Sequence, residues 1–261
     1  MNDRWNNAKL YESYVGRWSS LAADKFLNWM NLKDGLVWLD VGCGTGALTK
    51  VILNSQNPKK VICIDPSQYH TDFSREVISN DRAEFYVCGA EKIPIDDESV
   101  DAIVSGLVLN FIPGIELALA EFKRVAKKSA AIGAYVWDYS GKMEMMRYFW
   151  DAAGSLFEDA YEKDEAIRFK ICNSSSLGDL FISAGFSNVG TTFIDVPTVF
   201  KNFEDYWNPF LSGIGPAPGY CISLSEQKRE LLRQKIYSSL PIEKDGRIKL
   251  IARAIAVKGI K

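Results

Sequence analysis

The sequence has little of several things that define common classes of protein. It has one histidine, His70, and its five cysteines are scattered, with neither metal-ligand spacing nor an even number for pairing. No run of lysine and arginine stands out, and the formal net charge is −2. A histidine-based metal site, a disulfide framework and a basic surface for nucleic acid are therefore not favoured, and a reducing compartment fits best.

Long apolar runs are also missing. No uninterrupted apolar stretch is long enough to cross a bilayer. Residues 1–7 lack the apolar core of a signal peptide, so we expect a cytoplasmic protein that does not act at a membrane. What the 261 residues do contain is ample material for a core, 47% hydrophobic, with an ordinary 25% of charged residues. One large α/β domain or two small ones can form from such a chain.

Residues 37–53 are the most informative stretch of the sequence. Residues 37–41 form a short apolar run, typical of a strand buried on both faces. Gly42, Gly44 and Gly46 follow at alternate positions, and residues 47–53 are predicted to begin a helix. Glycines let the chain turn sharply and let a ligand approach the backbone, and N–H groups at a helix start carry a partial positive charge. The stretch predicts a ligand-binding turn between a strand and a helix.

The residues alone leave the ligand open. Gly42-x-Gly44-x-x-Ala47 satisfies the loose dinucleotide fingerprint. Asp65 ends the next apolar strand about twenty residues on, where an acid accepts hydrogen bonds from ribose hydroxyls. That distance suits NAD and S-adenosylmethionine (SAM) alike, because both carry an adenosine ribose. Asp65 can also be a plain helix cap, although Ser67 can fill that role instead.

Two passages together resemble class I SAM-dependent methyltransferases. The first is Asp-x-Gly-x-Gly-x-Gly, which begins at Asp40, and the second is the segment 89–101, which leads into the fourth strand. The resemblance covers residues 10–138 and is to the type-11 small-molecule group, which includes quinone-biosynthesis C-methyltransferases. It implies a Rossmann-like α/β fold with a seven-stranded, mostly parallel sheet, an antiparallel last strand and helices on both faces.

The same resemblance implies one methyltransferase domain over residues 1–261. We expect an N-terminal helical cover at about 8–30 and lid insertions at about 141–172 and 200–246. The insertions are rich in aromatic residues, which argues against disorder and suits the enclosure of a small acceptor.

The resemblance also implies a set of residues that bind SAM. The family more often has an acid where Gly89 or Ala90 stands, so we expect backbone atoms of Ala90 and Glu91 to contact adenine. The expected cofactor-binding residues are Tyr14, Arg17, Asp40, Gly42, Cys43, Gly44, Gly46, Asp65, Pro66, Gly89, Ala90, Glu91, Ser105 and Gly106.

The acceptor half of the site is not inherited from the family. Residue type and position suggest that Trp137, Tyr139, Trp207 and Tyr220 line the acceptor pocket. The implied reaction is in-line transfer of the SAM methyl group to a small-molecule nucleophile, which releases S-adenosylhomocysteine (SAH). We nominate no catalytic residue and no metal, because methyl transfer often needs only alignment and a dry site.

A nucleic-acid acceptor is not expected. Amino-directed methyltransferases carry an Asp/Asn-Pro-Pro-Tyr/Phe tetrad after the fourth strand, where this chain has Ser105-Gly106-Leu107-Val108. Two other functions stay open: a nicotinamide-dependent oxidoreductase, and a SAM-binding protein without catalytic activity. The acceptor, its reacting atom and the oligomeric state have no signature in the sequence.

Overall fold

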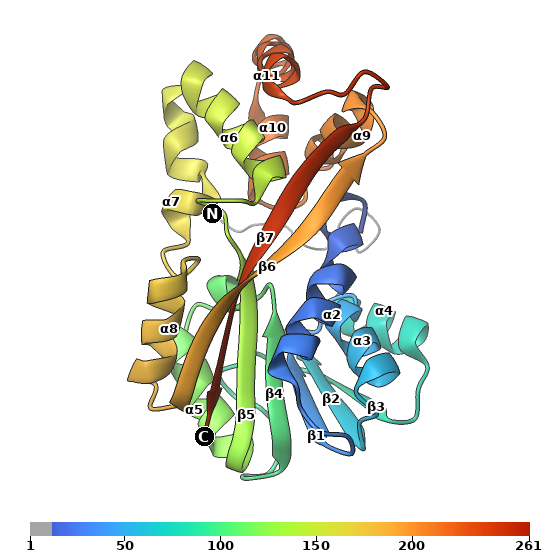
Figure 1. Ribbon diagram of the computed structural model, residues 1–261, viewed down its shortest axis with the longest axis vertical. Coiled ribbons are helices and arrows are strands. Elements are labelled where there is room, and N and C mark those ends of the chain that lie inside the picture. The colour runs from blue at the N-terminus through green and yellow to red at the C-terminus, as the bar shows by residue number, and fades with distance from the viewer. Residues whose placement is uncertain (1–11) are drawn as a thin grey trace. The chain divides into compact units, whose positions relative to one another are not determined.

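The structure is a computed structural model, and it describes residues 12–261. Its strands are β1 (Val37–Val41), β2 (Lys60–Asp65), β3 (Ala83–Val87), β4 (Val100–Gly106), β5 (Ala126–Trp137), β6 (Ser187–Phe200) and β7 (Ile248–Ile260). They form one sheet in the order β3-β2-β1-β4-β5-β7-β6. β1, β2, β3, β4 and β5 pair in parallel, and β7 runs in the opposite direction (Figure 1). The expected Rossmann-like fold with an antiparallel last strand is confirmed.

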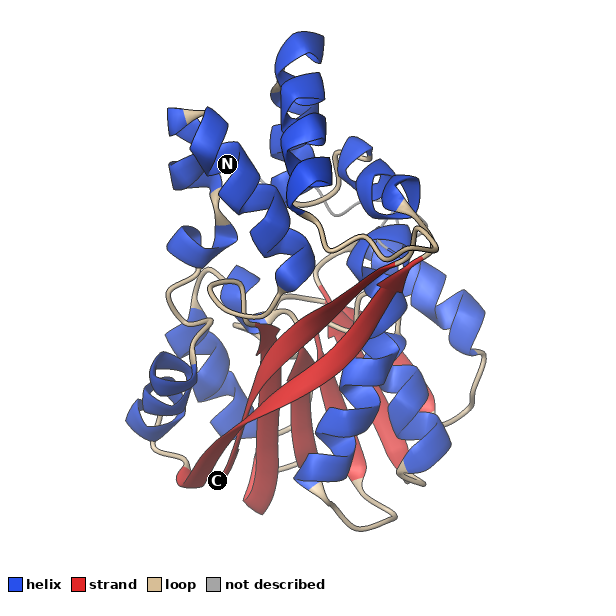
Figure 2. Ribbon diagram, turned by 45° about the horizontal axis from the view of Figure 1, so that its top comes forward, coloured by secondary structure: helices blue, strands red, loops and turns tan. Residues whose placement is uncertain are grey.

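Helices join the strands (Figure 2). A short π-helix, η1 (Glu12–Gly16), leads into α2 (Arg17–Met30). The other α-helices are α3 (Ala47–Ser55), α4 (Gln68–Ile78), α5 (Ile115–Val125), α6 (Glu144–Leu156), α7 (Glu165–Arg168), α8 (Ser174–Ser183), α9 (Phe203–Trp207), α10 (Pro216–Ser223) and α11 (Glu226–Ser239). Three short 3-10 helices are η2 (Leu109–Phe111), η3 (Glu158–Lys163) and η4 (Asn208–Leu211). No helix among residues 12–261 combines the length and apolar character needed to cross a membrane.

The described residues divide into two compact units. We call residues 19–136, 173–194 and 255–261 the sheet unit, and residues 12–18, 137–172 and 195–254 the insertion unit. The sheet unit contains the glycine-rich turn. The insertion unit contains both segments that the sequence predicts as lids.

The sheet unit is built on β1 and its two neighbours. Leu39 of β1 pairs with Ile62 of β2 and with Ile103 of β4, and all three are almost fully buried. Successive residues of a strand point to opposite faces, and nearly every residue of these strands is buried. Both faces are therefore covered, which explains the continuous apolar runs in the sequence.

The insertion unit has an aromatic core of its own. Phe210 is fully buried, stacks on Phe149 with ring centroids 4.5 Å apart, and meets the ring of Tyr14 edge-on at 5.7 Å. The ring centroids of Trp150 and Tyr220 lie 5.4 Å apart. Buried rings of this size contribute much of the free energy of folding in a small unit. The segment 200–246 is therefore an ordered part of the fold.

Candidate functional site

The turn after β1 uses its three glycines in different ways. Gly42, Gly44 and Gly46 have φ angles of +73°, +52° and +84°, a region that favours glycine. A Cβ atom on Gly42 would lie 2.5 Å from Val108, and one on Gly46 would lie 2.6 Å from Ile78. A Cβ atom on Gly44 would meet only a backbone oxygen, at 3.9 Å. Close packing against Val108 thus requires Gly42, and the positive φ of Gly46 favours glycine there, whereas the described residues leave the space beside Gly44 open.

The backbone of β2 anchors this turn. The N–H groups of Gly42 and Cys43 both donate to the carbonyl oxygen of Ile64, at 2.8 and 3.0 Å. Gly46 is the N-cap of α3 and makes no side-chain cap bond. The N–H groups of the first turn of α3 are therefore left to a ligand or to water.

Asp65 ties the end of β2 to the same turn. It is 7% exposed, and its carboxylate accepts from the N–H of Gly44 at 3.0 Å and from the N–H of Ser67 at 2.9 Å. Nδ1 of His70 lies 3.7 Å from the same carboxylate. The N-cap of α4 is Ser67, whose hydroxyl accepts from the N–H of His70. Asp65 therefore stands directly beside Gly44, the one glycine of the turn with open space next to it.

The segment after β3 places Gly89, Ala90 and Glu91 in the sheet unit, between β3 and β4. The Glu91 side chain folds back over the segment. Its Oε2 atom would lie 2.7 Å from a Cβ atom placed on Gly89. Its stem packs on the start of α5, since a Cβ atom on Gly114 would lie 3.2 Å from Glu91 Cγ. Ala90 is buried. The Glu91 carboxylate thus lies over the backbone that the sequence predicts to meet adenine.

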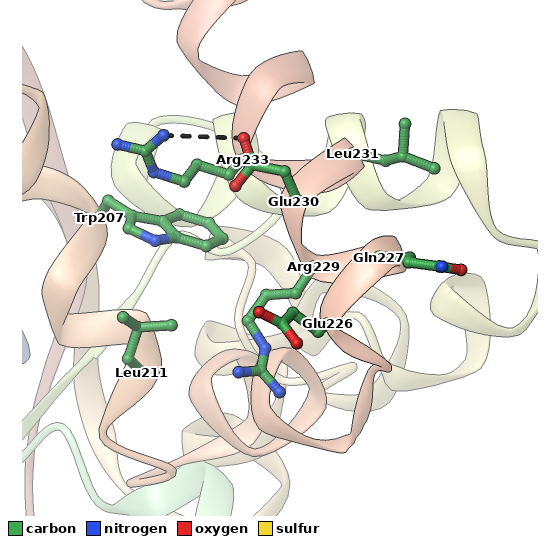
Figure 3. A pocket seen from close by; sticks show the side chains of 8 residues that line it. All are labelled: Trp207, Leu211, Glu226, Gln227, Arg229, Glu230, Leu231 and Arg233. Atoms are coloured by element: carbon green, nitrogen blue, oxygen red, sulfur yellow. Dashed lines mark ion pairs between the residues drawn. The ribbon is translucent and has the colours of Figure 1, made fainter.

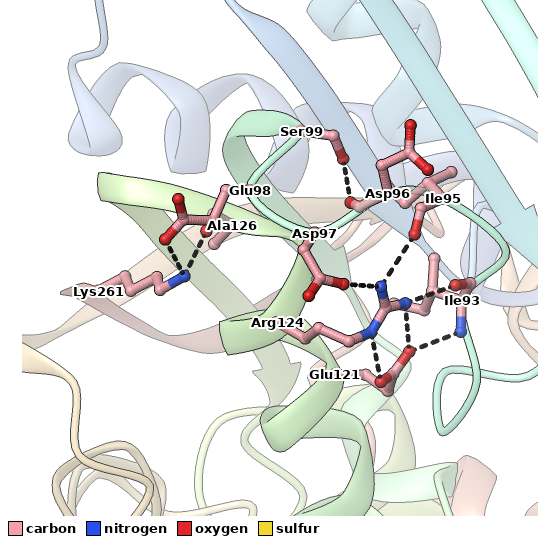
Figure 4. Close-up of polar contacts among 10 residues, drawn as sticks. All are labelled: Ile93, Ile95, Asp96, Asp97, Glu98, Ser99, Glu121, Arg124, Ala126 and Lys261. Carbon is pink, nitrogen blue, oxygen red and sulfur yellow. Dashed lines mark hydrogen bonds and ion pairs between the residues drawn. The ribbon is translucent and has the colours of Figure 1, made fainter.

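An arginine that sequence reasoning missed fixes the continuation of this segment (Figure 4). Arg124, on α5, donates to the carbonyl oxygens of Ile93 and Ile95 at 2.7 and 3.0 Å. It also pairs with Glu121 at 2.8 Å, and Glu121 accepts from the Ile93 N–H at 2.9 Å. Its contact with the exposed Asp97 adds little to stability, because solvent screens exposed pairs. Arg124 and Glu121 thus hold the segment in place, and they do so through α5, not through the glycine-rich turn.

The end of β4 lies next to β1, where the order of the strands reverses direction in the sheet. Ser105 is fully buried, and its hydroxyl donates to the Val41 carbonyl at 3.0 Å. A Cβ atom on Gly106 would lie 2.6 Å from the Tyr135 hydroxyl, so only glycine fits there. Open α/β sheets bind their ligands in the crevice at such a reversal point. The Ser105 hydroxyl is thus bonded to β1, and Gly106 lies opposite Tyr135 of β5.

Asn110, directly after this strand end, was missed by the sequence analysis. Both polar atoms of its amide are buried, and neither has a hydrogen-bond partner among the described residues. It lies on η2, two residues beyond Val108, the side chain that packs against Gly42. The sequence feature that could have indicated Asn110 is its place as the single amide in the apolar run Leu107–Ile112.

Comparisons with known proteins match this region. A model of the methyltransferase domain family matches residues 39–132, which run from β1 to β5. The ubiquinone/menaquinone biosynthesis C-methyltransferase of Burkholderia multivorans is 28% identical over 130 residues, 46% of this chain and 50% of that protein. The malonyl-[acyl-carrier protein] O-methyltransferase of Yersinia pestis is 35% identical over 101 residues, 38% of this chain and 35% of that protein.

Residues 39–132 match the methyltransferase domain family, and this match supports the resemblance to class I SAM-dependent methyltransferases. A solved structure from Bacillus halodurans, described as a methyltransferase, superposes with a TM-score of 0.62 at 17% identity and covers 92% of this chain and 98% of that one. At that identity it supports the fold alone. The stretch aligned with each curated relative spans half of that relative's length or less.

Asp40 gives the methyltransferase domain a buried charge whose state depends on pH. It is 1% exposed, and its Oδ2 accepts from the Thr49 hydroxyl at 2.6 Å, whereas Oδ1 has no partner among the described residues. Burial and, less strongly, the nearby Asp65 raise its pKa from 3.8 to about 7, against the lowering effect of the Thr49 hydrogen bond. The unpartnered Oδ1 fits a positively charged ligand such as SAM, with its sulfonium and ammonium groups.

We expect SAM binding to release a proton from Asp40. Free Asp40 holds its proton below about pH 7, and a bound cation lowers its pKa because it favours the carboxylate. The affinity for SAM should therefore rise as pH increases from 6 to 8. Calorimetry in two buffers of different ionisation enthalpy measures the released proton. Asp40→Asn keeps an acceptor for Thr49 and should abolish the release; an equal release in that variant contradicts the assignment.

The two N-terminal residues expected at the cofactor lie in the insertion unit. The Tyr14 hydroxyl donates to Met146 Sδ at 2.8 Å, and its ring belongs to the aromatic core. Arg17 pairs with Asp205 at 3.0 Å and lies 4.4 Å from the Trp18 ring centroid. Nε and one terminal nitrogen of Arg17 are buried without a partner in the described chain. Their expected contact with the SAM carboxylate stays a prediction.

The four residues expected around the acceptor also belong to the insertion unit. Trp137, Tyr139, Trp207 and Tyr220 are all between 2% and 7% exposed. Tyr220 donates to Asp159 at 3.1 Å, and burial together with this bond raises the pKa of its hydroxyl. Trp207 stacks on Phe203, and its ring centroid lies 6.2 Å from that of Phe210. All four pack in the unit's interior, and their expected role at the acceptor stays a prediction.

Trp207 also lines a hollow of about 670 Å³ (Figure 3). The other lining residues are Leu211, Glu226, Gln227, Arg229, Glu230, Leu231 and Arg233. Most come from α11, and the hollow is open to solvent. Small-molecule sites are usually enclosed. This hollow is therefore a weak candidate for the acceptor site.

Proposed function

We propose that this protein transfers a methyl group from SAM to a small-molecule acceptor and releases SAH. The observation that carries the proposal is the turn at the end of β1, with open space beside Gly44 and the Asp65 carboxylate directly next to it. The matched methyltransferase family and the two curated methyltransferase relatives support the reaction class.

Different residues of the sheet unit are proposed to bind different parts of the cofactor. We infer that Asp65 accepts hydrogen bonds from the ribose hydroxyls and that the unpartnered Oδ1 of Asp40 meets the positive charge of SAM. Gly44 leaves room for the ligand next to the backbone. SAM supplies the chemistry when bound, because its sulfonium carries a methyl group ready for displacement. The protein then has to align the acceptor and exclude water.

The composition of the insertion unit, the net charge of the chain and the names of the two relatives favour a small acceptor. The insertion unit is aromatic and apolar, and the net charge of −2 gives no general attraction for a polyanion. The two relatives are named for different acceptors. One is a C-methyltransferase of ubiquinone/menaquinone biosynthesis, and the other methylates a malonyl group bound to acyl-carrier protein. A carrier-protein acceptor is thus the main competitor to a free small molecule.

One assay separates these acceptors. The protein is incubated with methyl-labelled SAM and cell extract, and the products are separated into small-molecule, protein and nucleic-acid fractions. We expect label only in the small-molecule fraction. Label in protein or in nucleic acid contradicts the small-molecule acceptor. No label in any fraction, despite tight SAM binding, favours a SAM-binding protein without catalytic activity.

Changes in the insertion unit should affect the acceptor more than the cofactor. Tyr220→Ala removes a ring that packs on Trp150 and a hydrogen bond to Asp159, so we expect turnover to fall at least tenfold while SAM affinity stays within about twofold. Tyr220→Phe is the matched control because it removes only the hydrogen bond. Equal losses of turnover and SAM affinity in Tyr220→Ala would mean that this residue supports cofactor binding.

A further inference from the structure

Asn110 has polar groups that the fold does not use. Its amide can donate two hydrogen bonds and accept up to two, and both of its polar atoms are buried without a partner among the described residues. A buried polar group left unpaired costs about 1–3 kcal/mol. An apolar side chain of similar size, such as leucine, would avoid that cost.

The local backbone does not need the Asn110 side chain either. Asparagine near a turn usually bonds to neighbouring backbone groups. In η2 the N–H of Phe111 donates to the Val108 carbonyl at 2.8 Å, and the N–H of Ile112 donates to the Leu109 carbonyl at 3.3 Å. Backbone hydrogen bonds alone thus hold the turn. No contact among the described residues requires an amide at this position.

The position of Asn110 connects it to the methyltransferase site. It follows β4, the strand next to β1 on the other side of the point where the strand order reverses. Val108, two residues before it, occupies the space against Gly42, at the start of the glycine-rich turn. Leu107 between β4 and Val108 has φ of +63°, a strained conformation for leucine that is typical of functional sites. The amide therefore belongs to the ligand-binding end of the sheet.

We propose that Asn110 binds the methyl acceptor, and that the group it recognises is neutral and both donates and accepts a hydrogen bond, as a hydroxyl or an amide does. This inference rests on the proposed function. A carboxamide matches such a group with one donor and one acceptor. A phosphate or carboxylate would leave the amide oxygen facing negative charge, and a quaternary ammonium would leave the amide N–H unpaired.

Stability is the first test, because it does not depend on the acceptor's identity. Asn110→Leu should keep or raise the melting temperature, since it removes an unpaired buried amide. Asn173→Leu is the matched control. Asn173 caps α8 by accepting from the Ser176 N–H at 2.9 Å, so its loss should lower the melting temperature. A fall in Asn110→Leu as large as that in Asn173→Leu would show a structural role and overturn the proposal.

Binding and transfer give the second test. In Asn110→Leu, SAH affinity measured by calorimetry should stay within about twofold, while label entering the small-molecule fraction of cell extract should fall at least tenfold. A tenfold loss of SAH affinity would assign Asn110 to the cofactor and overturn the proposal. Unchanged label would overturn it too. If wild-type protein labels no fraction, the proposed function fails, and the inference fails with it.

A third variant tests the chemistry of the recognised group. Asn110→Asp gives an amide mimic only when the carboxyl group holds its proton. Its transfer activity relative to wild type should therefore rise as pH falls from 8 to 5. Higher activity than wild type at pH 8 would indicate a cationic acceptor group and contradict the neutral one.

Discussion

Gly44→Val is expected to abolish SAM binding while the protein stays folded. Apart from its chain neighbours, a Cβ atom at Gly44 would meet no atom of residues 12–261 closer than 3.9 Å, so a valine side chain would enter the space that the ligand needs instead of the core. We expect the affinity to fall at least about 100-fold, a loss of about 2.7 kcal/mol or more. Isothermal titration calorimetry with SAM measures the loss, and circular dichroism checks the fold.

Gly35→Val is the matched control. Gly35 has φ of +76° and nothing within 4 Å of a built Cβ, but it precedes β1, at the other end of the strand from the turn. Both variants place a β-branched residue in the left-handed region and should lose similar stability. Only Gly44→Val should lose SAM. Unchanged SAM affinity in Gly44→Val, or an equal loss in both variants, would refute the assignment of the turn.

Asp65→Ala is expected to weaken SAM by about 1.5–3 kcal/mol, the range for hydrogen bonds to a charged group. This corresponds to a loss of affinity of about 10- to 150-fold. Asp65→Asn should cost less, because an amide oxygen can still accept from a ribose hydroxyl. Calorimetry with SAM distinguishes the three proteins.

The variant needs a control because Asp65 also holds backbone N–H groups of Gly44 and Ser67. Asp101 does a similar job at the start of β4, where it accepts from the Val37 N–H at 2.9 Å and pairs with Lys127. Asp101→Ala should therefore lose stability without losing SAM affinity. If Asp65→Ala and Asp65→Asn both bind SAM as wild type does, Asp65 is only a support for the turn.

The sequence was most informative where one short segment determines its own geometry. The three positive φ angles of the glycine-rich turn follow from glycine at alternate positions after a buried strand, and Ser67 was recognisable as a helix cap. The antiparallel last strand followed from the resemblance to the methyltransferase family.

Prediction was weaker where side chains compete for the same role. Asn173 caps α8 although three serines follow it directly, and Ser225 caps α11 although Ser223 lies two residues before it. Serine and asparagine have nearly equal propensity for this position. Tertiary packing, which the local sequence does not contain, selects between them.

Residues that act across long separations could not be found from the sequence. Arg124 supports the segment after β3 from about thirty positions away, through carbonyl oxygens that carry no sequence signature. Asn110 is an unremarkable asparagine in the sequence, and only its unpartnered, buried amide marks it. Burial and hydrogen-bond satisfaction are properties of the folded chain.

We infer that the turn after β1 and the Asp65 carboxylate hold the cofactor of a methyltransferase. A crystal structure of the protein with SAH tests it most directly. We predict the ribose hydroxyls within hydrogen-bond distance of Asp65, the ligand against the backbone of Gly44, and adenine beside Gly89, Ala90 and Glu91. SAH bound elsewhere in the molecule, or a site that takes NAD and refuses SAH, would contradict the account.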